Sequence, residues 1–266
     1  MATLEETLRA LRERGRVGLI PYFPVGFPHA DSTVALASAA AAAGADAIEL
    51  GIPFSDPLAD GSTIQRATTR ALQNGITLAA CLDAARAVRR AGVTIPLLFM
   101  GYYNPFLRYG LTRFARDAAA AGIDGCIVPD LPPEEAGDLR AALDAVGIAL
   151  VAMVAPTSTE ERLRLAARTA RGFLYCVSVT GVTGARRDLP PDLPAFLARV
   201  RAVTDLPIAV GFGISTPEHV EQVGRLADLA IVGSAVVDRI DRPTTAEAAQ
   251  ALADYLRDLR ALAPAR

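Results

Sequence analysis

Short apolar runs alternate with longer helical segments along the whole of this 266-residue chain, and this alternation constrains the fold most strongly. The apolar runs span residues 18–25, 46–52, 95–102, 124–130, 148–155, 173–179, 206–213 and 226–233. Strands that read as continuous apolar runs, each followed by a helix, indicate a parallel sheet covered by helices. Eight such units in about 250 residues predict a (β/α)8 TIM barrel of the α/β class.

The segments between these runs are rich in Ala, Leu and Arg, and several begin with Ser, Thr or Asp and end at Gly, as helix caps require. We expect helices over 31–44, 62–75, 77–92, 111–122, 133–147, 158–172, 192–203, 215–226 and 246–262. An extra N-terminal helix over 3–15, with a Thr3–Glu6 capping box, is expected to close the barrel bottom. No linker divides the chain, so we predict one domain over 1–266. An open doubly wound sheet is the alternative, but the first strand–helix turn lacks G-x-G-x-x-G.

Composition narrows the chemistry that this chain can perform. It contains no lysine, which excludes Schiff-base catalysis and a lysine-bound pyridoxal cofactor. Its only histidines, His29 and His219, are expected to be exposed and not to bind metal, because a catalytic zinc site needs several close His or Cys ligands. Cys81, Cys126 and Cys176 are widely spaced and are expected to be buried, reduced thiols. We therefore expect neither a metal nor a cofactor.

The charge and hydropathy of the chain indicate where it works. A net charge of −2 provides no basic field for nucleic acid or for an anionic membrane. No uncharged apolar run reaches the roughly 20 residues that span a bilayer. The N-terminal segment is charged and amphipathic and lacks the apolar core of a signal peptide. We expect a cytoplasmic protein.

Two carboxylates frame the stretch IELGIPFSDPLADGSTIQ at residues 48–65. Glu49 lies inside an apolar strand and Asp60 in the loop that follows, so both are expected at the mouth formed by the carboxyl ends of the strands. Burial is expected to raise the pKa of Glu49 toward about 6–7, while Asp60 on a wetter loop stays ionised. The alternatives are a buried ion pair between Glu49 and an arginine, and capping of the next helix by Asp60.

Two glycine-rich turns, GFGIST at 211–216 and VGSAVV at 232–237, follow the seventh and eighth predicted strands. Glycine lets the backbone approach an anion closely, and these two loops commonly hold phosphate in such barrels. We therefore expect a phosphate site there, although the glycines are also compatible with simple tight turns. The long loop at 178–193 carries Gly181 and Gly184, and we interpret it as a lid.

The motifs ELGIPFSDPLADGSTIQ, GYYNPF, IVPDLPPEEA, TGVTGAR, GFGIST and VGSA together resemble the tryptophan synthase alpha family over nearly the whole chain. The resemblance implies cleavage of indole-3-glycerol phosphate to indole and glyceraldehyde 3-phosphate, with Glu49 and Asp60 as the acid/base pair and Tyr175 near the reacting carbon. The implied phosphate positions are Gly184, Gly213, Gly233 and Ser234, the cavity positions are Tyr22, Met100, Ile127 and Phe212, and Thr183 belongs to the lid. The first strand, PYFPVGFP, departs from a family pattern that tends to show Thr near Pro24 and Asp or Tyr near Phe27.

Such a retro-aldol cleavage needs an acceptor for the electrons of the breaking carbon–carbon bond. Protonation of indole C3 makes the ring itself that acceptor, so neither metal nor Schiff base is required. We expect Glu49 to protonate C3 and then to take the hydroxyl proton of the glycerol chain, with Asp60 holding the proton of N1. Tyr175 is expected either to donate a hydrogen bond or merely to pack.

The resemblance also implies a beta subunit partner, which carries pyridoxal phosphate and receives indole in an alpha2–beta2 heterotetramer. Patches at Pro53–Asp56, Gly101–Phe106 and Asp130–Glu135 are expected to form the docking face. The alternatives are a free-standing indole-3-glycerol-phosphate lyase, another phosphate-binding barrel such as a sugar-phosphate epimerase or the indole-glycerol-phosphate synthase, and a barrel that only activates a beta subunit.

Overall fold

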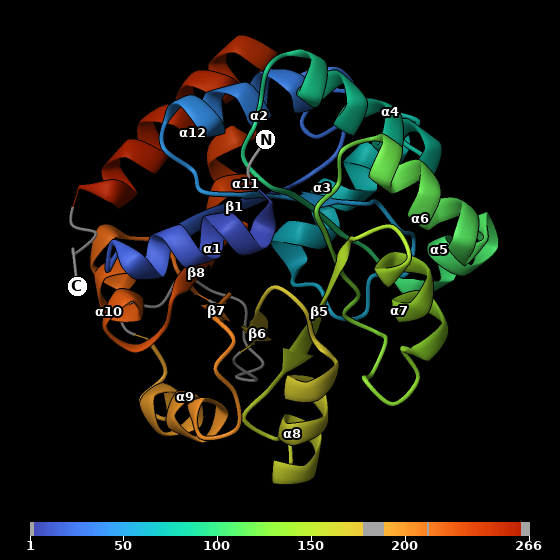
Figure 1. The fold of residues 1–266 in the computed structure, drawn as a ribbon. Coiled ribbons are helices and arrows are strands. Elements are labelled where there is room, and N and C mark those ends of the chain that lie inside the picture. Colours follow the sequence, from blue (N-terminus) through green and yellow to red (C-terminus); the bar gives the residue numbers. More distant parts are fainter. Residues whose placement is uncertain (1–2, 178–188, 212, 262–266) are drawn as a thin grey trace.

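The computed structural model describes residues 3–177, 189–211 and 213–261, and its strands close into a barrel (Figure 1). The strands are β1 (Gly18–Pro24), β2 (Ile48–Gly51), β3 (Leu97–Met100), β4 (Gly125–Ile127), β5 (Ala149–Val154), β6 (Leu174–Cys176), β7 (Ile208–Val210) and β8 (Leu229–Val232). They pair parallel in chain order, and β8 pairs with β1. Every strand lies within a predicted apolar run, which confirms the (β/α)8 barrel.

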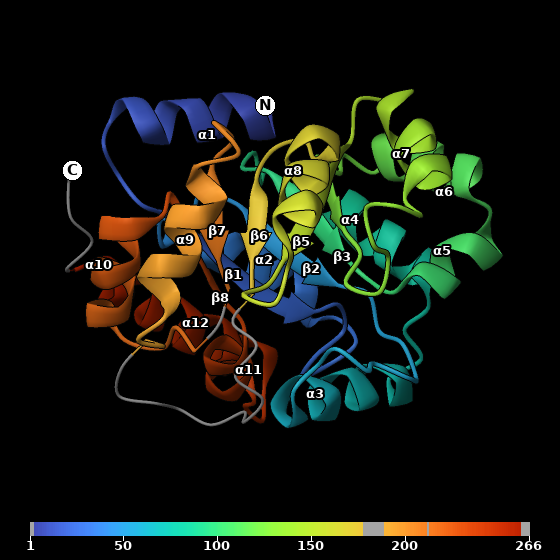
Figure 2. The ribbon, with the colours of Figure 1, turned by 90° about the horizontal axis from the view of Figure 1, so that it is seen from below.

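Helices surround the strands, as Figure 2 shows from a second direction. They are α1 (Leu4–Glu13), α2 (Ser32–Ala42), α3 (Ser62–Gln73), α4 (Leu78–Arg90), α5 (Tyr103–Tyr109), α6 (Leu111–Ala120), α7 (Gly137–Asp144), α8 (Glu160–Thr169), α9 (Leu193–Arg201), α10 (Pro217–Leu226), α11 (Ser234–Ile240) and α12 (Thr245–Arg260). All predicted helices are present. The short helices α5 and α11 were not predicted, because they lie in segments that read as a loop motif and a glycine-rich turn.

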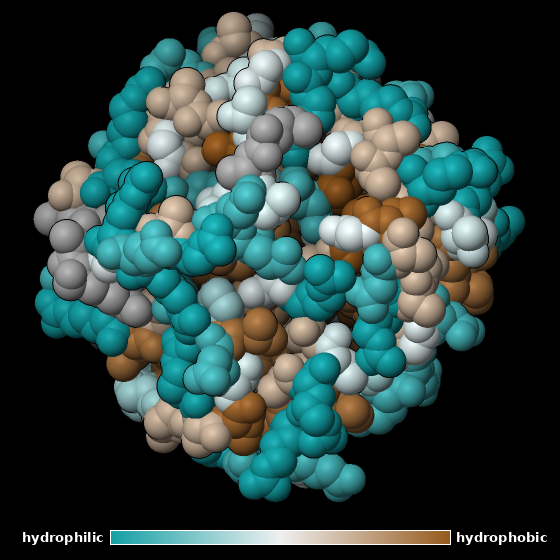
Figure 3. All heavy atoms as spheres, viewed as in Figure 1, coloured by the Kyte–Doolittle hydropathy of each residue, from teal (hydrophilic) through white to brown (hydrophobic). Residues whose placement is uncertain are grey.

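The extra helix α1 closes the bottom of the barrel, as expected. The Thr3–Glu6 capping box at its start is present. Its apolar positions Leu4, Leu8 and Leu11 recur with helical spacing and belong to the same buried cluster as the side chains that fill the barrel interior. In Figure 1 the helix crosses the end of the barrel, and in Figure 3 this face is mostly hydrophilic with separate apolar patches. Among the described residues, no helix is both long and apolar enough to cross a membrane.

Three aspartates clamp pairs of neighbouring strands at the end of the barrel that α1 covers. Asp46, Asp124 and Asp228 each lie just before an even-numbered strand. Each donates its backbone N–H, at 2.9 Å, to the carbonyl of a residue at the start of the preceding strand. Each carboxylate also accepts the backbone N–H of that same residue, namely Leu19 at 2.8 Å, Leu97 at 2.9 Å and Ile208 at 2.9 Å. The paired bonds tie β2 to β1, β4 to β3 and β8 to β7.

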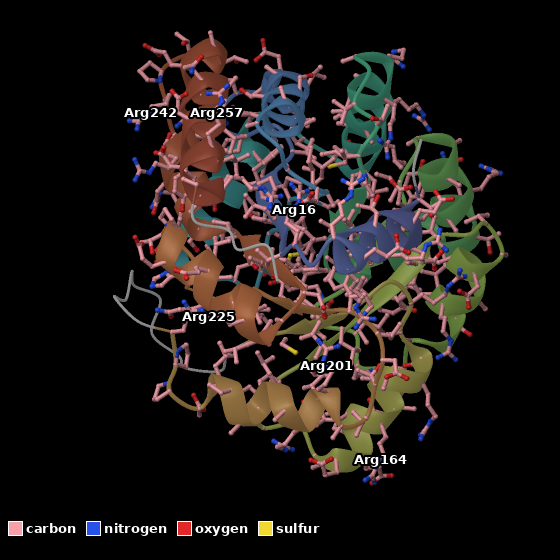
Figure 4. All side chains as sticks on the ribbon, turned by 60° about the vertical axis from the view of Figure 1, so that its left-hand side comes forward. Arg16, Arg164, Arg201, Arg225, Arg242 and Arg257 are labelled. Carbon is pink, nitrogen blue, oxygen red and sulfur yellow. The ribbon has the colours of Figure 1, made fainter. Side chains whose placement is uncertain are left out.

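Arginines neutralise each clamp. Asp46 pairs with Arg16 and Arg260, Arg89 donates to Asp124 at 2.6 Å, and Arg201 donates to Asp228 at 2.6 Å. In Figure 4 Arg16 and Arg201 lie toward the centre of the view, whereas Arg164 and Arg242 lie at its edge. Because a buried carboxylate without partners is costly, the arginines are what make these aspartates tolerable inside the fold.

The Asp228 clamp leads to a prediction about stability. Asp228→Ala should lower the free energy of unfolding by about 2–4 kcal/mol, because it leaves the N–H of Ile208 buried without an acceptor and removes the charge that faces Arg201. The control is Asp83→Ala, which removes an exposed ion pair with Arg86 and should cost less than about 1 kcal/mol. Urea denaturation at pH 7 measures both.

The stabilisation by Asp228 should depend on pH. Burial opposes ionisation of Asp228, but the bonds from Arg201 and from the N–H of Ile208 outweigh it and lower the pKa. A lowered pKa stabilises the folded state above the ordinary aspartate value of about 3.9, and this is lost as pH falls through the folded-state pKa. The stability gap between wild type and Asp228→Ala should therefore narrow below about pH 4. A gap that stays constant down to pH 3 would contradict the clamp.

Candidate active site

Glu49 lies on β2 inside the barrel, level with Tyr22 on β1 and Leu98 on β3. Its side chain is almost wholly buried, with 1% of the residue exposed. Among the described residues, neither of its carboxyl oxygens has a hydrogen-bond partner. A polar group that is buried without a partner is unfavourable, and a charged one far more so. Such a group is therefore held in its neutral form or kept for a ligand.

Burial raises the pKa of Glu49 to about 8, and the negative charge of Asp60 adds to the shift. The pKa is raised, as expected, and the increase is larger than the expected one to about 6–7. At neutral pH the carboxyl group is therefore mostly protonated and able to act as an acid. The alternative of an ion pair with an arginine is wrong, because no described arginine contacts Glu49.

Asp60 lies in the loop after β2 and is only partly buried. Burial raises its pKa to about 6, and a hydrogen bond from the hydroxyl of Tyr102 acts in the opposite direction. Asp60 is therefore mostly ionised at neutral pH, as expected. Its pKa is nevertheless higher than that of an aspartate in a fully solvated loop. The capping alternative is wrong: Gly61 is the N-cap of α3, without a side-chain cap, and Asp60 contributes only its carbonyl, to Gln65.

Tyr102 is a further site residue, and its role was not evident from the sequence. Its hydroxyl accepts the backbone N–H of Ala59 at 2.9 Å and also faces Asp60. Its ring lies against Phe54, with centroids 5.4 Å apart. These contacts hold the loop after β2 against the end of β3. The sequence feature that could have indicated this role is the position of Tyr102, two residues after the end of β3 and therefore at the mouth of the barrel.

The two expected site tyrosines, Tyr22 and Tyr175, lie in the wall around Glu49. Both are buried, and the charges of Glu49 and Asp60 help to raise the pKa of each hydroxyl, after burial itself. Two glycines make room for them. A β-carbon on Gly51 would lie 2.4 Å from the hydroxyl of Tyr22, and one on Gly211 would lie 2.2 Å from that of Tyr175.

The remaining cavity positions are apolar and adjacent. Met100 on β3 is in register with Ile127 on β4, and both side chains belong to the barrel interior, with Ile127 fully buried. The expected cavity residue Phe212 lies outside the described residues. Among the described residues expected to line the cavity, the polar side-chain groups are thus the hydroxyls of Tyr22 and Tyr175, which suits an aromatic ligand with few polar atoms.

The expected phosphate positions that the structure describes lie at the ends of β7 and β8. Gly213 is exposed, and a β-carbon there would meet open space. Its φ of +68 would nevertheless strain any other residue at this position. Gly233 follows β8 and is the N-cap of α11, which begins at Ser234. A β-carbon on Gly233 would lie 3.6 Å from the ring of Tyr22. The expected lid and phosphate residues Thr183 and Gly184, with Gly181, lie outside the described residues.

The expectation for His219 is wrong, because the residue is buried, with 1% exposed. It lies in the first turn of α10, where its Nδ1 accepts the N–H of Ser215. His29 is partly exposed, and its Nε2 lies 3.2 Å from the carbonyl of Arg242. The three cysteines are buried free thiols, as expected. Within the described part of the chain, no cluster of His, Cys, Asp or Glu has the arrangement of a metal site.

Comparison with known proteins agrees with this geometry. The family model for the tryptophan synthase alpha chain matches residues 8–263. The tryptophan synthase alpha chain of Roseiflexus sp. (strain RS-1) is 54% identical over 98% of this chain and 100% of its own, and that of Chloroflexus aggregans is 53% identical over 97% of both.

Solved structures extend the comparison to the fold. The crystal structure of tryptophan synthase subunit alpha from Legionella pneumophila str. Paris superposes with a TM-score of 0.90 at 38% identity, covering 98% of this chain and 97% of that chain. A chain of Mycobacterium tuberculosis tryptophan synthase gives a TM-score of 0.89 at 40% identity, covering 98% of both. By sequence and by fold, the chain belongs to the tryptophan synthase alpha chain family.

Proposed function

We propose that this chain cleaves indole-3-glycerol phosphate to indole and glyceraldehyde 3-phosphate, with Glu49 and Asp60 as an acid/base pair. The observation that carries the proposal is the buried carboxyl of Glu49, which has no partner among the described residues and has a pKa of about 8, beside an Asp60 with a pKa of about 6. At neutral pH one group is ready to donate a proton and the other to hold one. Family membership sets aside the epimerase and the indole-glycerol-phosphate synthase.

In the proposed reaction Glu49 first transfers its proton to indole C3, while the carboxylate of Asp60 holds the proton on N1. The ring becomes an N-protonated indolenine, whose positively charged C=N can accept electrons. The newly ionised Glu49 then takes the proton of the hydroxyl on the carbon bonded to C3. The carbon–carbon bond breaks, its electron pair restores the aromatic ring, and the hydroxyl carbon becomes an aldehyde. Glu49 ends protonated again, so no proton or electron is left over.

The other proposed positions surround this centre. Tyr22, Met100 and Ile127 border the indole, and the hydroxyl of Tyr175 lies near the carbon that reacts. Gly213, Gly233 and Ser234 bind the phosphate with backbone N–H groups and a hydroxyl, together with Gly184. Thr183 and Phe212 complete the lid and the cavity in this proposal. No cofactor or metal takes part.

We propose further that the barrel mouth docks a beta subunit that carries pyridoxal phosphate, in a cytoplasmic alpha2–beta2 heterotetramer. The support is local: Leu58 is 93% exposed and Leu107 is 53% exposed, both beside the expected patches. Asp130 accepts the N–H of Tyr103 at 2.9 Å, which joins two of these patches. The alternative is a free-standing indole-3-glycerol-phosphate lyase. A measurement of binding to a beta chain distinguishes it from a subunit of the heterotetramer.

Substitution of Glu49 tests the acid directly. Glu49→Gln should lower kcat for indole release by about 100- to 10,000-fold, the usual contribution of a general acid/base. The unfolding midpoint at pH 7 should change little, because glutamine resembles the neutral carboxyl that the site holds. Glu161→Gln, at an exposed position on α8, is the matched control and should retain full activity. A folded Glu49→Gln enzyme with wild-type turnover would refute the assignment.

The pH profile tests the pairing of the two carboxyl groups. In wild type, kcat/KM should fall above about pH 8, where Glu49 loses its proton. Because the charge of Asp60 raises the pKa of Glu49, Asp60→Asn should shift this alkaline limb to lower pH, in addition to lowering the rate. The alkaline limb is the informative one, since the substrate phosphate itself titrates near pH 6. An alkaline limb that stays in place in Asp60→Asn would show that the two groups do not interact.

Substitution of Leu58 tests the docking face. Leu58→Asp should weaken binding to a tryptophan synthase beta chain from the same source by about tenfold or more, because it places a charge in the proposed apolar contact. Leu226→Asp, at a surface position on α10, is the matched control and should bind normally. Isothermal titration calorimetry measures both. Equal affinity of the Leu58 variant and wild type would place the docking face elsewhere.

A further inference from the structure

Ser215 lies in the loop between β7 and α10, and side chains hold both polar groups of its backbone. Its N–H donates to Nδ1 of His219 at 3.3 Å, and its carbonyl accepts the hydroxyl of Tyr255 at 2.9 Å. Both of these side chains are buried, with 1% and 6% of the residues exposed. His219 belongs to α10 and Tyr255 to α12, so two helices determine the orientation of one loop residue.

The residues on either side of Ser215 are also held. Ile214 is buried, with 3% exposed, which anchors the loop against the core. The hydroxyl of Thr216 accepts the N–H of His219 at 3.3 Å and caps α10. Gly213, in contrast, is exposed and faces open space. The loop therefore has three residues held by burial or by hydrogen bonds with buried side chains, preceded on its N-terminal side by one exposed glycine.

Tyr255 is itself fixed by its surroundings. The helices α10 and α11 both pack against α12, and the three lie together in Figures 1 and 2. The guanidinium of Arg239 on α11 lies 5.1 Å from the centroid of the Tyr255 ring. A ring held by burial and by a cation above its face leaves its hydroxyl little freedom, so the bond to Ser215 is a fixed restraint.

We propose that His219 and Tyr255 are positioning residues that orient the backbone of the Gly213 turn toward the phosphate of the substrate. The inference rests on the phosphate role that the proposed function gives to this loop. Neither side chain touches the ligand; each acts through Ser215. A turn whose N–H groups already point at the anion loses less freedom on binding, so the restraint increases phosphate affinity and leaves the carbon–carbon chemistry unaffected.

The test measures the reverse reaction, the condensation of indole with an aldehyde, in the full-length chain. Tyr255→Phe removes only the hydroxyl and keeps the ring beside Arg239. The KM for glyceraldehyde 3-phosphate should rise about 3- to 10-fold, the equivalent of one hydrogen bond. The kcat/KM for unphosphorylated glyceraldehyde should stay unchanged. The dissociation constant of glycerol 3-phosphate, measured by calorimetry, should rise by the same factor as KM.

Tyr109→Phe is the matched control, because the hydroxyl of Tyr109 donates to Asp117 at 2.9 Å and Arg113 lies over its ring, away from this loop. It should alter neither substrate. His219→Asn keeps an acceptor at the position of Nδ1 and should preserve phosphate affinity, whereas His219→Leu removes the acceptor and should lower the affinity. This difference separates an effect on the loop from a general loss of packing.

Two outcomes overturn the inference, and they can be distinguished. If folded Tyr255→Phe binds glycerol 3-phosphate as tightly as wild type does, while wild type prefers the phosphorylated aldehyde, the positioning role is wrong and the phosphate site stands. If wild type itself shows no preference for glyceraldehyde 3-phosphate over glyceraldehyde, the proposed phosphate site is wrong, and the inference fails with it.

Discussion

The desolvation of one carboxyl group, that of Glu49, is the constraint on which the site depends. Among the described residues nothing donates a hydrogen bond to it or neutralises it, so the fold favours its protonated form. The same apolar interior that stabilises the barrel thus keeps Glu49 protonated at neutral pH, whereas a glutamate in water would be ionised. Asp60 stays nearer to solvent, and its charge strengthens the effect on Glu49. The two carboxyl groups differ because their depths in the barrel differ.

Carboxyl groups have opposite environments at the two ends of the barrel. At the end covered by α1, Asp46, Asp124 and Asp228 are surrounded by arginines and by backbone N–H groups, and they hold neighbouring strands together. Toward the mouth, Glu49 has none of these partners among the residues that the structure describes. Satisfied charges make a structure rigid, whereas an unsatisfied one is available to a ligand. A rigid lower end lets the mouth keep an unfavourable group without losing the fold.

Small residues determine where the polar groups of the wall can lie. Gly51 and Gly211 leave room for the hydroxyl groups of Tyr22 and Tyr175, which would otherwise meet a β-carbon. Glycines in such strands are easily interpreted as signs of turns or of close ligand approach, and here two of them accommodate a neighbouring side chain inside the barrel. The shape of the barrel interior is thus produced by pairs of residues far apart in the sequence, a large tyrosine and a glycine without a side chain.

The sequence alone determined the barrel, its eight strands, the closing helix α1 and the two carboxylates, because apolar periodicity, caps and local motifs are properties of neighbouring residues. It did not reveal α5 and α11, which are short, nor the strand clamps, the contact of Tyr102 with Asp60 or the burial of His219. Those depend on which side chains meet after the strands close into a ring. Only the tertiary structure decided that no described residue would pair with Glu49, because solvation and pairing are set by residues distant along the chain.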